Sequence, residues 1–292
     1  MVYDRFLVPV DRNETTARAV EWGLSFTERR DISVDFLHVV EDDSRRVPLL
    51  TRPAAPSQTV SEFPEEFERL VSGAGDRASR HVVTGVPQEE IIRFAVENGA
   101  DLIVMGQDSK TGINSRLFES VADKVIRTAP VPVLAVPDVD GTCRLDQLLV
   151  PVTTGISSEN AIAHAAAVAD EFGATIHVVN VVDVQRAGGP FNAGGVSKSF
   201  VERLKRDARP AVDEALDQFS DLGVDTPIES TVITGSHHEA IDEYVTTNDI
   251  DLVVAGRYAE SRIKRRVLGH ATEHVLNAID VPLLVVPNDP RA

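Results

Sequence analysis

The chain contains the same unit twice, and this duplication constrains its fold more than any other feature. One constant offset superposes Asp-x-x-Leu-Val-Pro-Val at residues 4–10 on the same motif at residues 146–152. A second, larger offset superposes Asp-Leu-x-Val-x-Gly at residues 101–106 on residues 251–256. Neither register needs a gap, so we interpret the chain as a tandem duplication of one domain.

The second offset exceeds the first, which predicts one insertion between Asp183 and Thr234. A chain of 292 residues is long enough for two domains of ordinary size. We therefore expect the first domain at residues 1–139 and the second at residues 144–292, joined by a linker at residues 140–143.

Strand and helix patterns alternate along each unit. In the first unit the predicted strands are residues 5–10, 32–40, 80–85, 101–106 and 131–137, and the predicted helices are residues 13–30, 65–79, 87–99 and 120–129. The strands are short, nearly continuous apolar runs, as in parallel sheets that are covered on both faces. The predicted fold class is therefore α/β, with two doubly wound five-stranded parallel α/β sandwich domains.

The charge balance restricts the partners of the chain. There are 46 acidic and 29 basic side chains, a net charge of −17. So negative a surface repels nucleic acid and anionic membranes, and we expect neither as a partner. The N-terminus lacks the apolar run of a signal peptide, and we expect a cytoplasmic protein. The acidic, lysine-poor composition also leads to the hypothesis of a halophilic host with a cytosol of molar salt.

Several of these segments together resemble the universal stress protein (UspA-like) family. The resemblance rests on LVPVD at residues 7–11, ADLIVMG at 100–106, APVPVLAVP at 129–137 and GHATEHVL at 269–276. It implies a stress-response binding and regulatory protein that is gated by ATP, ADP or AMP, with Mg²⁺ accompanying ATP, and that acts on an unknown protein client. Two alternatives stay open: a weak ATP-hydrolysing enzyme, and a nucleotide-free scaffold with degenerate sites.

Nucleotide-binding members of this family carry Gly-x2-Gly-x9-Gly followed by Ser or Thr, and an acidic residue after the first strand. In the first half the positions implied for binding are Pro9, Asp11, Val39, Gly106, Ser109 and Ser120. Glu119 stands where the third glycine is expected, and a carboxylate there would repel a triphosphate. The resemblance therefore implies an intact adenosine side and a damaged phosphate side.

In the second half the implied positions are Pro151, Val181, Gly256, Arg257, Ala259, Arg265, Gly269 and His270. Here Thr153 replaces the acidic residue, but two of the three glycines are present. We therefore expect a triphosphate or a free anion to favour the second half, and the first half to accept at most an adenosine-like ligand of low charge.

Two clusters in the second half have alternative interpretations. Residues 257–266 contain five of the 29 cations, which fit either an anion clamp or a basic surface loop that pairs with acidic helices. His270 and His274 have a spacing that can chelate zinc. No Cys, HExxH motif or suitably spaced carboxylate joins them, so we expect no metal site, and His270 is interpreted as a helix cap or a phosphate ligand.

No motif for covalent or phosphoryl-transfer catalysis is present, because the chain has neither G-x-x-x-x-G-K-[ST] nor G-x-S-x-G. The last predicted strand of each unit is apolar, and an exposed apolar edge favours aggregation. We therefore expect residues 131–137 and 281–287 to pair within one chain. A homodimer of the whole chain is left open.

Overall fold

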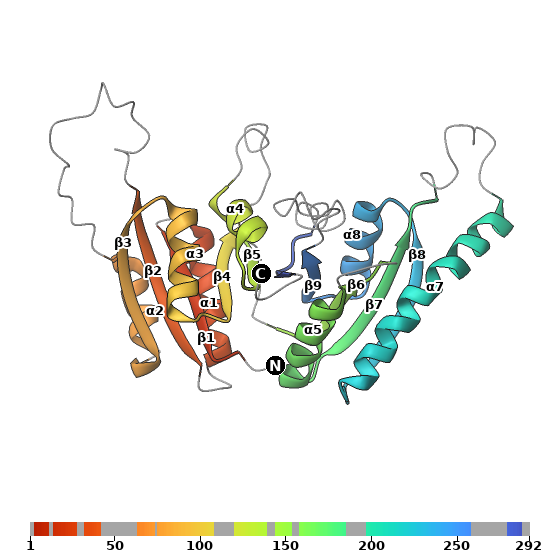
Figure 1. Cartoon of the computed structure of the whole chain (residues 1–292), viewed down its shortest axis with the longest axis horizontal. Coiled ribbons are helices and arrows are strands. Elements are labelled where there is room, and N and C mark those ends of the chain that lie inside the picture. Colours follow the sequence, from red (N-terminus) through yellow and green to blue (C-terminus); the bar gives the residue numbers. More distant parts are fainter. Residues whose placement is uncertain are drawn as a thin grey trace, which may run out of the picture. The chain divides into compact units, whose positions relative to one another are not determined.

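The computed structural model describes residues 3–11, 14–27, 32–41, 63–73, 75–107, 120–138, 144–153, 158–184, 197–257 and 279–287. The chain divides into two compact units, one of residues 3–138 and one of residues 139–292 together with residues 1–2 (Figure 1). The predicted linker at residues 140–143 lies outside the described residues.

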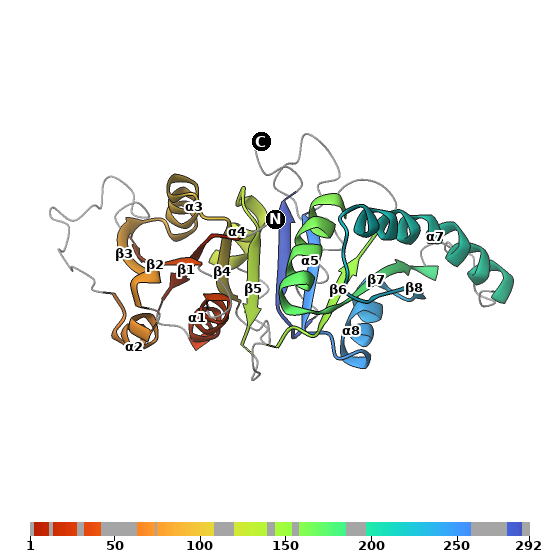
Figure 2. The same cartoon turned by 90° about the horizontal axis from the view of Figure 1, so that it is seen from below.

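The first unit alternates strands and helices along its described sequence. Its elements are β1 (Arg5–Val10), α1 (Glu14–Thr27), β2 (Ser33–Glu41), α2 (Glu65–Gly73), β3 (Ala78–Gly85), α3 (Pro87–Asn98), β4 (Leu102–Gln107), α4 (Val121–Thr128) and β5 (Val133–Pro137). The strands form a parallel sheet in the order β3-β2-β1-β4-β5. Helices α1 and α2 cover one face of this sheet, and α3 and α4 cover the other (Figure 2).

The described residues of the second unit repeat the order of elements of the first unit from the first strand to the fourth, and the last described element is again a strand. Its described elements are β6 (Gln147–Pro151), α5 (Ser158–Phe172), β7 (Thr175–Val182), α7 (Lys198–Asp221), β8 (Ile228–Thr234), α8 (His237–Thr247), β9 (Leu252–Arg257) and β10 (Leu283–Pro287). Its parallel strands follow the order β10-β9-β6-β7-β8, the same winding as in the first unit. The doubly wound α/β class is therefore confirmed.

The strand registers reproduce the two offsets that the sequence predicted. In the first unit Val34 of β2 lies opposite Ala78 of β3, and in the second Ile176 of β7 lies opposite Ile228 of β8. Val34 and Ile176 are related by the smaller offset, whereas Ala78 and Ile228 are related by the larger one. The insertion therefore falls between β7 and β8, where α7 has 24 residues and the corresponding α2 has nine.

Helix α3 begins and ends as its sequence predicts. Pro87 occupies the first turn, where a missing N–H costs no hydrogen bond. Gly99 follows the helix with a φ of 67°, and Ala100 N–H donates to the Ala95 carbonyl at 2.9 Å. By contrast, the helix predicted at residues 65–79 is too long. It ends at Gly73, and Gly75 takes a φ of 63° before β3 begins at Ala78.

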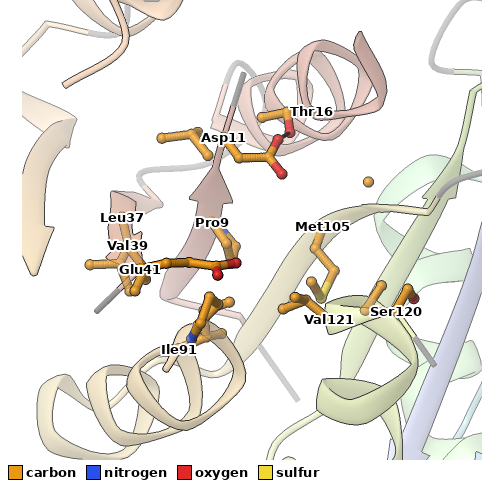
Figure 3. Close-up of a pocket in the computed structure, with 14 residues that line it drawn as sticks. Pro9, Asp11, Thr16, Leu37, Val39, Glu41, Ile91, Met105, Ser120 and Val121 are labelled. Carbon is orange, nitrogen blue, oxygen red and sulfur yellow. Dashed lines mark hydrogen bonds between the residues drawn. The ribbon is translucent and has the colours of Figure 1, made fainter. Parts of the chain in front are cut away.

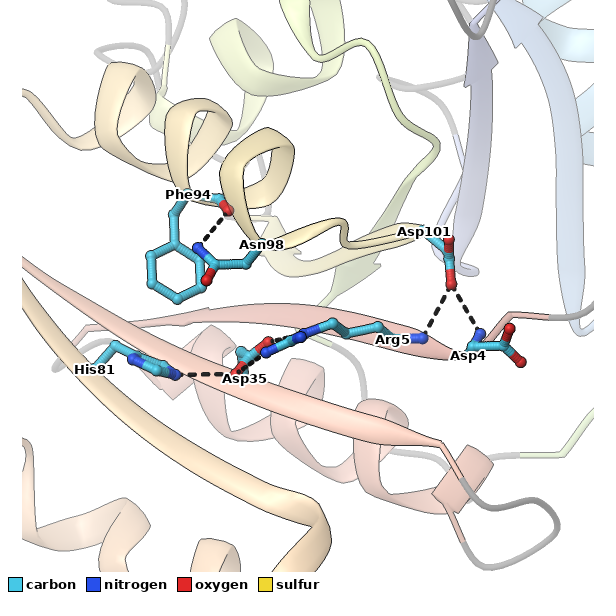
Figure 4. A network of polar contacts seen from close by, with 7 residues as sticks. All are labelled: Asp4, Arg5, Asp35, His81, Phe94, Asn98 and Asp101. Atoms are coloured by element: carbon cyan, nitrogen blue, oxygen red, sulfur yellow. Dashed lines mark hydrogen bonds and ion pairs between the residues drawn. The ribbon is translucent and has the colours of Figure 1, made fainter.

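In both units a carboxylate accepts hydrogen bonds from backbone N–H groups at the beginning of the first strand. Asp101 Oδ2 accepts hydrogen bonds from the backbone N–H groups of Asp4 at 2.8 Å and Arg5 at 3.0 Å (Figure 4). In the second unit Asp251 Oδ2 accepts from Asp146 at 2.8 Å and from the following N–H at 2.9 Å. The duplicated Asp-Leu motif therefore holds β4 to β1, and β9 to β6, by the same contact.

The first sheet also contains a buried ion-pair network. The Asp35 side chain is 2% exposed and receives Arg5 Nε at 2.6 Å and His81 Nε2 at 2.9 Å (Figure 4). The His81 ring lies against Phe94, with 4.7 Å between ring centroids. The network joins three strands near the amino-terminal end of the sheet, because Arg5 and Asp35 both lie early in their strands.

No helix among the described residues is long and apolar enough to cross a membrane. Strand β5 pairs with β4, and β10 pairs with β9, as the last strand of each unit. The predicted pairing of residues 131–137 with residues 281–287 stays a prediction.

Candidate functional site

A pocket of about 270 Å³ opens in the first unit where its central strands end. It lies at the carboxyl ends of β1, β2 and β4 and at the beginnings of α3 and α4, as expected for a ligand site in a doubly wound sheet (Figure 3). The structure brings five of the predicted positions together in its lining: Pro9, Asp11, Val39, Gly106 and Ser120. Ser109, the sixth, lies outside the described residues.

Asp11 is positioned by a contact that the motif did not predict. The Thr16 hydroxyl, on the first turns of α1, donates to Asp11 Oδ1 at 2.5 Å. Thr16 is only 5% exposed, so this hydrogen bond holds the carboxylate at one side of the pocket (Figure 3). A carboxylate there can accept hydrogen bonds from hydroxyl or amine groups of a ligand.

Apolar side chains form much of the remaining lining. Leu37 and Val39 come from β2, Ile91 from α3, Met105 from β4 and Val121 from α4. A mostly apolar site with a few fixed polar groups is typical of small-molecule binding sites. Asp11 supplies a carboxylate at the polar side of this part of the pocket.

The N-terminus of α4 is capped by side chains of the protein itself. The Ser120 hydroxyl accepts a hydrogen bond from Asp123 N–H at 3.0 Å, and Asp123 Oδ2 accepts one from Ser120 N–H at 3.2 Å. This reciprocal capping box places a carboxylate at the end of the helix where a phosphate would be expected. Ser120 is therefore at the predicted place, but its hydroxyl already serves as the cap of α4.

Glu41 is a pocket residue that sequence reasoning missed. It is the last residue of β2, and its side chain lines the pocket beside Pro9 (Figure 3). The signal was available, because Glu41 follows Val39 by two positions and side chains at that spacing share one face of a strand. Asp123 and Thr16 were also missed, since neither belongs to the glycine motif.

One hydrogen bond at the end of the first strand occurs in both units with different residues. His38 Nδ1–H donates to the Val10 carbonyl at 2.9 Å, and Asn180 Nδ2–H donates to the Val152 carbonyl at 2.9 Å. His38 and Asn180 occupy equivalent positions of the duplicated unit, as do the two valines. Both side chains therefore orient the backbone that follows the first strand of their unit.

The second unit places some of its predicted positions at the corresponding strand ends. Pro151 ends β6, Val181 lies near the end of β7, and Gly256 and Arg257 end β9. Burial lowers the pKa of the Arg257 guanidinium from its ordinary value. Ala259, Arg265, Gly269 and His270 lie outside the described residues, as does His274.

Metal ligands do not gather in the part of the chain that the structure describes: no group of three or more His, Cys, Asp or Glu side chains there could hold an ion. The resemblance implied Mg²⁺ only together with ATP. No role of Mg²⁺ is therefore assigned to a described residue.

Comparison with protein families matches both units to one family. The model described as "Universal stress protein family" matches residues 2–137 and 145–287. Universal stress protein Rv2005c of Mycobacterium tuberculosis is 23% identical over 298 residues, which cover 96% of this chain and 95% of that protein. Universal stress protein MJ0531 of Methanocaldococcus jannaschii is 31% identical over 144 residues, or 46% of this chain and 82% of that protein.

Solved structures show the same fold over the whole chain. A universal stress protein from Archaeoglobus fulgidus has a TM-score of 0.64 and 16% identity, and the match covers 98% of this chain and 97% of that one. A functionally unknown protein, PA1789 from Pseudomonas aeruginosa, has a TM-score of 0.63 and 17% identity, with 99% and 94% coverage. At these identities the likeness concerns the fold alone.

Proposed function

Because the chain belongs to the universal stress protein family, we propose that it is a cytoplasmic stress-response regulator whose first-domain pocket binds an adenine nucleoside or nucleotide. The observation that carries this proposal is the meeting of Pro9, Asp11, Val39, Gly106 and Ser120 around one pocket. These residues come from three separate strands and from the beginning of α4.

The pocket supports binding through a division into an apolar part and a polar part. The base would lie among Leu37, Val39, Ile91 and Met105, and ribose hydroxyls would donate to Asp11. The proposed regulation is a population shift, in which occupancy favours one arrangement of a surface that a client protein recognises. A ligand achieves this only if it binds the two arrangements with different affinity.

For the second domain we propose a preference for anionic ligands. Gly256 and Arg257 end β9, and Arg257 takes the place of Gln107, which ends β4 of the first domain. A guanidinium forms charge-assisted hydrogen bonds with phosphate, about twice as strong as neutral ones. Four further cations follow Arg257 within residues 258–266.

The experiment that tests the proposed function is extraction of small molecules from the purified full-length chain, followed by calorimetric titration with adenosine, AMP and ATP. We expect at least one adenine compound to bind with a measurable dissociation constant. Val39→Trp should abolish binding in the first-domain pocket, because the larger ring fills the apolar part.

The matched control is Val40→Trp, which introduces the same side chain at the next residue of β2, on the opposite face of the strand. Full binding by this variant would show that loss in Val39→Trp is local. Absence of co-purified and titrated adenylates in the wild-type chain would instead favour a scaffold whose sites are degenerate.

A further inference from the structure

Three carboxylates are arranged around the first-domain pocket and its adjoining helix end. Asp11 and Glu41 line the pocket from β1 and β2, and Asp123 caps α4 behind Ser120. None of the fourteen lining residues that the structure describes is a lysine, arginine or histidine. Asp11 and Glu41 therefore place a carboxylate on each of two sides of the part of the pocket that the structure describes.

The capping contact determines what the helix end can bind. Asp123 is 6% exposed, and its carboxylate already accepts the Ser120 N–H hydrogen bond. A helix N-terminus favours one negative charge in its first turn, and Asp123 supplies it. A phosphate at the same place would have to displace this carboxylate or lie beside it, and like charges at short range repel.

Glu41 places another carboxylate on a different side of the pocket, and this carboxylate also repels a phosphate. Its side chain lies beside Pro9 in the pocket, whereas Asp11 lies with Thr16 (Figure 3). Carboxylates accept hydrogen bonds and attract cations, so both groups favour a ligand that presents hydroxyl or amine donors. The volume of about 270 Å³ lies just below the usual range of ligand pockets, about 300–1,000 Å³, and is compatible with a nucleoside-sized ligand.

We propose that Glu41 and Asp123 determine the charge specificity of this pocket, which selects a nucleoside-sized, phosphate-free ligand that is neutral or positively charged. The nucleobase in this statement rests on the proposed function, whereas the charge preference is argued from the positions of the carboxylates around the pocket.

The test is titration of the full-length chain with adenosine, AMP and ATP at fixed ionic strength without Mg²⁺. In the Arg257→Gln background, which weakens anion binding in the second domain, we expect ATP to bind at least tenfold more weakly than adenosine. Glu41→Gln should lower the ratio of the ATP to the adenosine dissociation constant at least threefold. Asp123→Asn should lower this ratio further, while the amide oxygen of the new side chain still caps α4. A ratio that stays unchanged in both variants overturns the assignment of these residues.

Glu89→Gln is the matched control, because it removes the same charge from an exposed position on the first turn of α3 that does not line the pocket. We expect the adenosine-to-ATP ratio to stay as in the wild-type chain. An equal narrowing in Glu89→Gln would mean that overall charge, and not the pocket carboxylates, sets the preference, and would overturn the proposal.

Two probes without adenine separate the failure of this inference from the failure of the proposed function. Tryptamine and indole-3-propionate share a ring and carry opposite charges, and their binding is followed by ligand-observed NMR with Val39→Trp as the blocked form. If no adenine compound binds but tryptamine does, the charge preference stands and the proposed function falls. Stronger binding of indole-3-propionate, or binding of neither probe and no adenine compound, overturns the inference.

Discussion

One buried position on the second strand has a carboxylate in the first domain and an imidazole in the second. In the first domain Asp35 lies there, and it is held by Arg5 and His81. In the second domain His177 lies at the equivalent position, and it is 4% exposed. Both positions are buried and polar, but one network contains a full ion pair.

The partners changed together with the central residue. His177 Nε2–H donates to Gln147 Oε1 at 2.8 Å, and the Tyr244 hydroxyl donates to His177 Nδ1 at 3.0 Å. Gln147 takes the place of Arg5, and Tyr244 takes the place of Phe94. Burial lowers the pKa of His177, while Glu229 opposes the shift, so the imidazole favours the neutral form.

This difference shows which contacts the duplication preserves. The Asp101 and Asp251 contacts with backbone N–H groups are the same in both domains, because every residue except proline provides such a group. Contacts between side chains need both partners to change, since a buried charge without its partner is strongly unfavourable. The polar core therefore diverged as whole networks, within an unchanged backbone register.

The largest expected effect on the free energy of unfolding comes from replacing one member of the Asp35 network alone. Arg5→Gln places the second-domain residue beside Asp35 and leaves its carboxylate with His81 only. Loss of a partner of a buried charge costs about 3–5 kcal/mol, and because Arg5 is 40% exposed we expect about 3 kcal/mol. Urea unfolding followed by the fluorescence of Trp22, the only tryptophan, reports the first domain.

The matched control for Arg5→Gln is Arg93→Gln on the exposed surface of α3, where the arginine pairs with Glu90 and Glu97. Exposed ion pairs contribute about 0–1 kcal/mol, so this variant should unfold nearly as the wild type. Equal destabilisation by the two variants would contradict a special role for burial at Asp35.

The second prediction concerns the pH dependence of the stability of the second domain. His164 on α5 occupies the position that Trp22 has on α1 of the first domain. Burial lowers the pKa of His164 to about 4. Between about 6.5 and that value the unfolded chain binds a proton that the folded domain does not. The second domain should therefore lose about 3 kcal/mol as the pH falls through this window, about 2 kcal/mol of it by pH 5.

Hydrogen exchange of β7 peptides at pH 7.5, 6 and 5 measures this effect, after correction for the intrinsic pH dependence of exchange. His164→Phe, which introduces an aromatic ring of similar size, should reduce the pH dependence of the second domain. An unchanged dependence in His164→Phe would assign it to other groups, such as His177.

The fold was predictable to the extent that it depends on local pattern. Apolar runs located the strands, and Pro87 with Gly99 located both ends of α3. The helix at residues 65–79 was predicted too long because its later residues are compatible with a helix. The early end follows from a left-handed backbone at Gly75, which a sequence pattern permits but does not require.

The candidate site was predictable where the motif carries it and not where partners are distant in the chain. Asp11 and Gly106 follow from motif positions, and they meet in one pocket. The contact of Asp35 with His81 joins residues 46 positions apart, and no spacing rule indicates it. Asp123 was missed because its role is a hydrogen bond to Ser120, which a reading of phosphate motifs does not consider.

A third prediction sharpens the comparison of the two networks. Tyr244→Phe introduces the first-domain residue and removes one hydrogen bond from His177 while keeping the aromatic ring, whose centroid lies 5.8 Å from that of His177. We expect a loss of about 1 kcal/mol, the net contribution of one neutral hydrogen bond. The reverse change Phe94→Tyr should gain nothing of this size, and hydrogen exchange of β7 and β3 peptides measures both.

The smallest expected effect concerns the residue that follows the third helix of each domain. Gly99 has a φ of 67°, and Asp249, at the equivalent position of the second domain, has a φ of 48°. Both precede the same hydrogen bond, because Ile250 N–H donates to the Val245 carbonyl at 3.0 Å as Ala100 donates to Ala95. Glycine takes this left-handed conformation without strain, whereas it costs other residues about 1 kcal/mol, or less when their side chain is short and polar.

Asp249→Gly should therefore stabilise the second domain by about 0.5–1 kcal/mol, and Gly99→Asp should destabilise the first by a similar amount. A Cβ at Gly99 would have no atom within 4 Å other than those of its chain neighbours, so the backbone conformation decides the sign of the effect. Asp249→Ala separates this cause from charge, because alanine removes the carboxylate but keeps a Cβ in the left-handed region. A gain in Asp249→Ala as large as in Asp249→Gly would assign the effect to relief of acidic repulsion, and the two domains would then differ in electrostatics at this turn and not in backbone strain.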